Sequence, residues 1–279
     1  MESGFGYFAT HDAVRPGVLA QLVEQRGHDA LFFTEHTHIQ AWGEPPVPPE
    51  GGTLPRKYAH TYDALTACTA AGVVTTRLRV GTGVCLVPQH HPISLAKTVA
   101  SVDHLTGGRF ELGVGAGWNE PEIRNHGVDP ARRFAVMKEN IEAMRRIWTQ
   151  DEAEYHGEFV SFDPILSWPK PAQRPHPPVL VGGTGPRVLD RVLSYGDGWL
   201  PNYAPDVLDR VGELRRRAED AGRTVVTVVM AAPADPAVLE ACERAGVARV
   251  MAWLPSAGLD RLQREMDAFE AALAKARGE

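Results

Sequence analysis

The sequence predicts an α/β fold, a (β/α)8 barrel of the TIM type. Its length of 279 residues is close to the roughly 250 that such barrels need. Segments with strand and helix character alternate eight times along the chain, which indicates strand–helix units rather than an all-β or all-α fold. Most strand segments are continuous apolar runs, typical of parallel strands covered on both faces. We therefore expect one domain over residues 1–279, with an open doubly wound sheet as the second choice because it usually has fewer strands.

The first four units occupy the first half of the chain. Pro16 suits the first turn of a helix and Gly27 suits the position after its end, so these residues delimit the first helix. The four expected strands are residues 5–9, 30–34, 78–86 and 110–114. The helices that follow them are residues 16–26, 62–75, 93–105 and 132–149.

The last four units follow at shorter spacing. Their expected strands are residues 179–181, 198–201, 225–231 and 248–254. Their expected helices are residues 186–195, 205–221, 236–245 and 259–277.

Two connections are too long to be simple turns. One follows the second strand, over residues 36–60, and is rich in proline and glycine. The other lies between the fourth helix and the fifth strand; it forms an insertion over residues 151–178, with six prolines between Pro164 and Pro178. Within it, residues 153–162 suggest a small hairpin centred on Gly157.

The composition limits the classes of partner that the protein is expected to bind. The net charge is -6 and basic residues are not clustered, which argues against nucleic acid and against an anionic membrane surface. No apolar run approaches the ~20 residues that span a bilayer, and the amino terminus lacks the pattern of a secretory signal. The three cysteines, Cys68, Cys85 and Cys242, are far apart and suit a reducing cytoplasm. A small-molecule substrate is the expected partner.

Residues 94–122, SLAKTVASVDHLTGGRFELGVGAGWNEPE, are the most informative stretch. Gly113, Gly115 and Gly117 leave the carboxyl end of a strand without bulk, so a flat ligand could approach the backbone where barrels bind ligands. The stretch closely resembles the luciferase-like monooxygenase superfamily, especially its branch that uses the deazaflavin coenzyme F420. The resemblance extends over nearly the whole chain, and it implies a barrel oxidoreductase that is often a homodimer.

The segment VGGTGPRVL, residues 181–189, predicts an anion site. Its glycines allow a tight turn, and the following helix start presents amide hydrogens and a positive dipole end. The segment is similar to the loop that holds the flavin or deazaflavin phosphate in this family. The resemblance implies that Gly182, Gly183, Thr184 and Gly185 bind the cofactor.

His36 is the expected catalytic residue, because an imidazole can move a proton near neutral pH while a hydride moves elsewhere. In F420-dependent sugar-phosphate dehydrogenases an acidic residue followed by His ends the second strand, and Glu35-His36 stands there in this chain. The same resemblance implies that Asn119, with Gly117 close by, contacts the deazaflavin head. Those dehydrogenases carry a glutamate just before the asparagine, where this chain has Gly117-Trp118. That departure favours another substrate, or a reductase that uses the reduced coenzyme.

Further pocket residues are expected around these groups. The third strand resembles the family strand whose backbone bulges behind the cofactor ring, as a cis peptide in several members, which implies Gly83, Val84 and Cys85 as cofactor contacts. Aromatic side chains that could wall an apolar substrate pocket are Trp42, Trp118, Trp199 and Trp253.

The main prediction is hydride transfer between coenzyme F420 and a small organic substrate, most simply as a reductase. FMN with a monooxygenase activity is the closest alternative; FMN lacks the lactyl-glutamate tail of F420, for which Arg56 and Lys57 are candidate contacts. A metal-dependent hydrolase is another class, because His36 and His38 have the His-x-His spacing of amidohydrolase barrels, and His11 could join them. The last alternative is a barrel without catalytic activity that only binds a partner or pigment.

Overall fold

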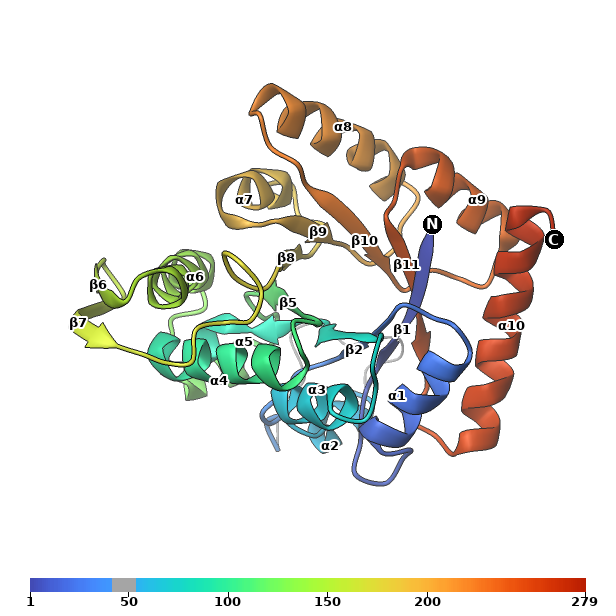
Figure 1. The fold of residues 1–279 in the computed structure, drawn as a ribbon, viewed down its shortest axis with the longest axis horizontal. Coiled ribbons are helices and arrows are strands. Elements are labelled where there is room, and N and C mark those ends of the chain that lie inside the picture. The colour runs from blue at the N-terminus through green and yellow to red at the C-terminus, as the bar shows by residue number, and fades with distance from the viewer. Residues whose placement is uncertain (42–53) are drawn as a thin grey trace.

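The computed structural model describes residues 1–41 and 54–279 and is a closed barrel of parallel strands ringed by helices (Figure 1). The barrel strands in chain order are β1 (Glu2–Tyr7), β2 (Ala30–Phe33), β3 (Arg79–Thr82), β4 (Cys85–Leu86), β5 (Phe110–Gly115), β8 (Val179–Gly182), β9 (Gly198–Leu200), β10 (Val226–Met230) and β11 (Arg249–Leu254). Hydrogen bonding runs β3-β2-β1-β11-β10-β9-β8-β5, and pairing of β3 with β5 closes the circle. The predicted TIM barrel is confirmed.

Helices pack around this barrel, including two short ones that the sequence pattern did not predict, α2 and α5. The helices are α1 (Pro16–Gln25), α2 (Lys57–His60), α3 (Ala64–Gly72), α4 (Pro92–Leu105), α5 (Glu120–Asn125), α6 (Arg133–Thr149), α7 (Val188–Tyr195), α8 (Val207–Asp220), α9 (Pro236–Ala245) and α10 (Leu259–Arg277), with a 3-10 turn at Val87–Gln89. Among the described residues, no helix is both long and apolar enough to cross a bilayer.

The third barrel position differs from the single strand expected over residues 78–86. It is broken into β3, which pairs with β2 and β5, and β4, which pairs with β5 alone. The break is at the Gly83-Val84 peptide, which is cis. An unbroken apolar run does not reveal where a strand changes its partners.

The core has two layers. Inside the barrel, β-strand side chains such as Phe32, Leu200 and Met251 pack against each other, and a larger layer lies between the strands and the helices. At the amino ends of the strands, Arg249 of β11 binds Glu111 of β5 with both terminal nitrogens, at 2.8 and 3.1 Å, and also contacts Glu2 of β1. This ion cluster closes the end of the barrel opposite the strand ends where ligands bind in such folds.

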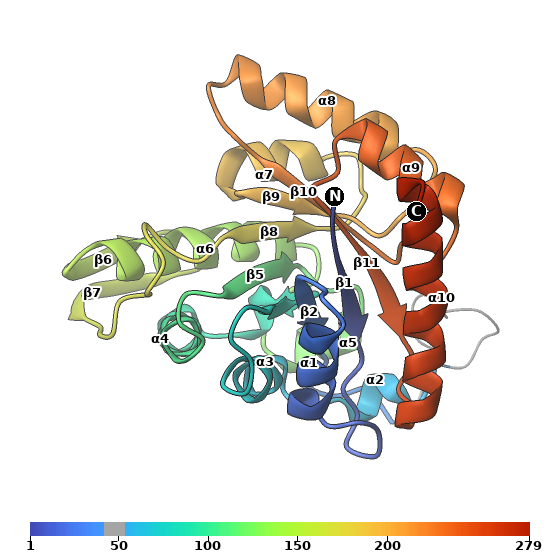
Figure 2. The same cartoon turned by 45° about the vertical axis from the view of Figure 1, so that its right-hand side comes forward.

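The expected insertion is a two-stranded antiparallel hairpin, β6 (Glu152–His156) and β7 (Ser161–Leu166). It lies outside the barrel beside α6, at the edge of the molecule (Figure 2). The Glu139 carboxylate on α6 accepts hydrogen bonds from the backbone N–H groups of Glu158, Phe159 and Val160, which fixes the hairpin turn to the helix.

Candidate functional site

Aromatic side chains gather at the carboxyl ends of β1, β2, β5 and β11. The His36 ring, three residues beyond β2, lies 5.1 Å from the Tyr58 ring and 5.8 Å from the Trp118 ring. Tyr58 in turn contacts Phe8, and Phe8 contacts Trp253, with ring centroids 5.0 and 5.5 Å apart. We call these five residues the aromatic mouth. Two of the tryptophans expected in the pocket, Trp118 and Trp253, therefore belong to one continuous cluster with His36.

Glu122 on α5 holds His36. Its Oε2 lies 2.9 Å from His36 Nδ1, and its Oε1 accepts a hydrogen bond from the Thr37 N–H at 3.0 Å. The His36 and Glu122 side chains are 6% and 1% exposed, so this contact is shielded from solvent. Burial by itself would raise the pKa of Glu122, but the hydrogen bond and charge of His36, the Thr37 amide and His38 outweigh burial and lower the pKa. The carboxylate is therefore ionised and fixes the orientation of the imidazole.

The sequence could not link these two residues, which are 86 positions apart. The available signal was local: Asn119-Glu120-Pro121-Glu122 has the pattern of a helix start, with Pro121 in the first turn. A carboxyl in that first turn stands beside the carboxyl end of β5. The sequence does not indicate Tyr58 and Phe8 as site residues, because single aromatic residues outside a regular pattern carry no recognisable spacing.

His38, the second histidine of the His-x-His pair, has hydrogen-bond partners different from those of His36. His38 contacts Thr37 Oγ1 through Nδ1 and Asn125 through Nε2, each at 2.9 Å, whereas His36 is directed to Glu122. The two rings of the His-x-His pair thus face different partners. Within the described part of the chain, the grouping whose ligand atoms lie close enough together for a metal is Glu35, Cys85 and His90, which includes neither of them. The structure gives the amidohydrolase hypothesis no support.

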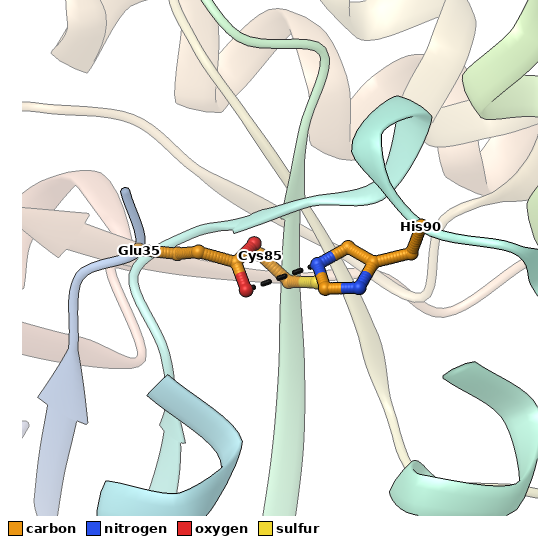
Figure 3. A group of neighbouring side chains, drawn as sticks. All are labelled: Glu35, Cys85 and His90. Carbon is orange, nitrogen blue, oxygen red and sulfur yellow. Dashed lines mark hydrogen bonds and ion pairs between the residues drawn. The ribbon is translucent and has the colours of Figure 1, made fainter. Parts of the chain in front are cut away.

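The Glu35 carboxylate contacts a different set of residues from His36, although the two residues are adjacent in the sequence. Its Oε2 accepts from the Leu86 N–H at 2.5 Å and its Oε1 lies 3.0 Å from His90 Nε2. Figure 3 shows Glu35 and His90 reaching toward each other from opposite sides, and the Cys85 sulfur lies close to their contact. Burial and the Glu35 charge raise the pKa of the Cys85 thiol well above its ordinary value, so the thiol stays protonated and is a poor metal ligand. Glu35 thus fastens β4, and both of its carboxylate oxygens are engaged by residues other than His36.

The break between β3 and β4 shapes the barrel mouth. A Cβ added to Gly115 would lie 2.5 Å from Val84 Cγ2, and one added to Gly182 would lie 2.9 Å from Val84 Cγ1. Val84 therefore stands between the ends of β5 and β8, in space that only glycines there leave open. Gly83 and Val84 are half-buried, whereas the Cys85 side chain is fully buried in the outer core layer. Gly83 and Val84 could contact a ligand; Cys85 could do so only through its backbone.

Buried polar atoms without partners mark the same end of the barrel. Asn119 donates from Nδ2 to Gln40 at 3.0 Å, but its Oδ1 has no hydrogen-bond partner among the described residues. The same holds for both amide atoms of Gln89 and for Thr34 Oγ1. Such atoms are costly when left unpaired. They fit a ligand with several hydrogen-bonding edges, such as a flavin or deazaflavin ring.

The glycine loop after β8 is exposed and keeps its backbone open. The Gly183 carbonyl accepts from Trp199 Nε1 at 2.8 Å, and Arg210 on α8 donates to the Thr184 and Gly185 carbonyls at 2.5 and 3.1 Å. In a trans peptide the C=O and the following N–H point in opposite directions. The N–H groups of Thr184 and Gly185 therefore point away from Trp199 and Arg210, and they could receive an anion.

The expected pocket residue Trp199 is buried behind the glycine loop. Trp199 is 0% exposed and packs in the layer between barrel and helices, so it supports the glycine loop and does not wall a substrate pocket. Side chains alternate along a strand, and this one points outward from the barrel. Trp42 lies outside the described residues.

Comparison with known proteins identifies the family to which the chain belongs. The family model for luciferase-like monooxygenases matches residues 11–278. The chain belongs to the luciferase-like family. This confirms the resemblance carried by the glycine-rich stretch and the glycine loop.

Curated relatives of this luciferase-like chain use different cofactors. An uncharacterised protein of Mycobacterium tuberculosis is 37% identical over 98% of this chain and 99% of its own length. The F420-dependent glucose-6-phosphate dehydrogenase of Nakamurella multipartita is 29% identical over 78% of this chain and 63% of its own. The FMNH2-dependent dimethylsulfone monooxygenase of Pseudomonas putida is 31% identical over 59% and 46%. The family therefore includes F420-dependent and FMN-dependent oxidoreductases.

Solved structures share the fold. The F420-dependent tetrahydromethanopterin reductase of Methanopyrus kandleri superposes with a TM-score of 0.70 over 97% of each chain, at 18% identity. The monooxygenase RslO1 of Streptomyces bottropensis superposes with a TM-score of 0.67 over 99% of this chain and 82% of its own, at 22% identity.

Proposed function

We propose that this protein is an F420-dependent oxidoreductase that reduces a small organic substrate with the reduced coenzyme. The observation that carries the proposal is the His36–Glu122 pair in the aromatic mouth. The coenzyme supplies a hydride when bound, and reducing a carbonyl or a polarised double bond also requires a proton from elsewhere. An oriented imidazole in an apolar pocket is suited to supply that proton.

Each region of the site has a distinct task in this proposal. The N–H groups of Thr184 and Gly185 would bind the phosphate, and Val84 would support the ring. Asn119 and Gln89 would pair with polar atoms of the ring edge, which would satisfy their unpartnered atoms. Trp118 and Trp253 would exclude water from the substrate.

His36 would donate a proton from Nε2, because Nδ1 is engaged by Glu122. The ionised Glu122 stabilises the protonated imidazole before the transfer and keeps the ring in place after it. The proton and the hydride together complete a two-electron reduction. Glu122 does not touch the substrate in this scheme and acts as a positioning residue.

The length of the alignment supports the choice of F420 in this proposal. The F420-dependent glucose-6-phosphate dehydrogenase aligns with 78% of this chain at 29% identity, whereas the FMNH2-dependent monooxygenase aligns with 59% at 31% identity. The latter supports an FMN-dependent monooxygenase as the second candidate. A homodimer, as the resemblance implies, is part of the same proposal.

Titration of the purified protein with coenzyme F420 and separately with FMN, followed by the fluorescence of the cofactor, tests the proposal. We expect F420 to bind more tightly than FMN by at least about tenfold, a difference of about 1.4 kcal/mol. Tighter binding of FMN would move the protein to the second candidate, and binding of neither would contradict both.

A further inference from the structure

A cavity lies at the rim of the barrel, between the first turns of α6 and the side of α7, from Arg187 to Tyr195. It encloses about 390 Å³, and its polar lining includes Lys138, Arg187, Arg191 and Tyr195. Arg187 precedes α7 directly and is two residues beyond Gly185, the last glycine of the phosphate-binding loop proposed above. We call this cavity the rim site. A ligand held by the glycine loop could extend into it without crossing the barrel mouth.

The rim site carries an excess of positive charge. The guanidinium carbons of Arg191 and Arg133 lie 3.7 and 4.9 Å from the centre of the Phe134 ring, which holds both groups in place. Burial, followed by the charges of Arg187 and Arg133, lowers the pKa of Arg191, although Tyr195 and Asp190 oppose that shift. Asp190, the acidic residue of the lining, already binds Arg217 at 2.5 Å. Like charges this close predict an anionic ligand.

The helix starts add to this charge. Both α6 and α7 begin without a side-chain cap, at Arg132 and Arg187 respectively. Phe134 in the first turn of α6 and Arg187 both line the rim site, so the positive dipole ends of the two helices lie next to it.

A buried hydroxyl gives an independent sign of a ligand. Tyr195 is 3% exposed and lines the rim site, yet its hydroxyl has no hydrogen-bond partner among the described residues. Burial raises its pKa to about 12, although the nearby Arg191 works against that, so the group is a hydroxyl donor at neutral pH. A carboxylate in the cavity would pair with this donor.

Arg56 and Lys57, the candidate tail contacts that the sequence offers, are engaged elsewhere. Arg56 forms an ion pair with Asp12, and Lys57 Nζ lies 4.3 Å from the centre of the Phe8 ring in the aromatic mouth.

We propose that the rim site binds carboxylates of the glutamate tail of coenzyme F420, and that it thereby selects this coenzyme over FMN. The inference rests on the proposed function, since it assigns the far end of the same ligand. It identifies Arg187, Arg191 and Tyr195 as the tail contacts.

Binding of F420 with its glutamates is compared with binding of F420 prepared without them, for wild type and for an Arg187→Gln/Arg191→Gln double variant. We expect wild type to prefer the complete tail and the double variant to lose about tenfold of that preference, as for one or two charge-assisted hydrogen bonds. An Arg215→Gln/Arg216→Gln double variant on α8 removes the same charge from an exposed surface and should keep the preference. FMN affinity should be the same in all three proteins.

Tyr195→Phe removes the unpartnered hydroxyl and keeps the ring. It should weaken the tail preference several-fold without lowering the melting temperature, because the hydroxyl stabilises nothing in the free protein. A purely structural role for Tyr195 would lower the melting temperature and leave the preference intact, which would contradict its assignment.

A γ-linked triglutamate without any deazaflavin separates this inference from the proposed function. If F420 fails to bind in either form, calorimetric binding of triglutamate to wild type, and its loss in the Arg187→Gln/Arg191→Gln variant, would still support the rim site. Binding of F420 with no tail preference would overturn the inference and leave the proposed function standing. Failure of both F420 and triglutamate to bind would overturn both.

Discussion

At the scale of single residues, the site depends on which side chain faces which. His36 could be found from the sequence because it follows an apolar strand, and strand ends converge in a barrel. Its neighbour Glu35 looked equivalent but faces the opposite way, toward Leu86 and His90. Glu122 could not be found, because its contact with His36 depends on how α5 is placed after β5. Sequence indicates strand ends well, but not the direction of each side chain beyond them.

Glu122→Gln should lower kcat for reduction of a substrate by about 10- to 100-fold, less than the roughly 10²- to 10⁴-fold loss expected for His36→Asn. The amide keeps the size of the carboxyl but cannot stabilise a protonated imidazole. The measurement is the pH profile of kcat/KM, which should shift in Glu122→Gln. A profile unchanged in shape, with only the rate reduced, would indicate that Glu122 does not act through His36.

The same substitution should alter stability with a defined dependence on pH. The pKa of Glu122 is lowered from its ordinary value of 4.5 in the folded protein. Its ionised form therefore stabilises the fold above about pH 4.5, and that contribution is lost as the pH falls through the lower folded pKa. Urea unfolding of both proteins should show the largest difference near neutral pH and a shrinking one toward about pH 4.

At the scale of elements, the glycine loop and α7 form one unit. The sequence predicted a helix from Pro186, but α7 begins at Val188, because Gly185 accepts a hydrogen bond from Val188 N–H in a turn that still contains Pro186. Proline suits both a first helical turn and a preceding turn, so its presence alone does not fix the boundary. Arg210, a residue of the next helix, also holds two carbonyls of the loop, and no local sequence pattern shows these contacts.

Arg210→Leu should weaken the binding of both F420 and FMN by several-fold, because both carry a phosphate and the loop amides would lose their common orientation. Arg216→Leu, on the same helix but exposed, is the matched control. Fluorescence titration measures both variants. A loss confined to F420 would instead connect Arg210 with the tail.

At the scale of the whole molecule, the barrel was predictable because its evidence is repeated along the chain. Eight alternating segments of similar length constrain the topology even when individual boundaries shift by two or three residues, as β1 does. The closing interaction at the far end was not predictable. Arg249, Glu111 and Glu2 come from distant parts of the chain, and each alone reads as an ordinary charged residue at a strand start.

Arg249→Met should destabilise the fold by about 3–5 kcal/mol, because it leaves the Glu111 carboxylate buried without its bidentate partner. The double variant Arg249→Met/Glu111→Leu should recover much of that loss, since an apolar pair of similar volume replaces the ion pair. Urea unfolding measures both. Cofactor affinity should stay at the wild-type level in the double variant, because the cluster lies at the opposite end of the barrel. A double variant no more stable than the single one would contradict this account.

The arrangement of tryptophans has an optical consequence. Trp118 and Trp253 flank the place where a ligand would enter, and Trp199 donates to the glycine loop. Indole emission depends on its surroundings, and it overlaps the absorption of flavins and deazaflavins. The tryptophan emission of the protein therefore reports whether a ligand occupies the site, independently of the fluorescence of the ligand. Replacing each indole in turn would separate the signal of the ring end from that of the phosphate end.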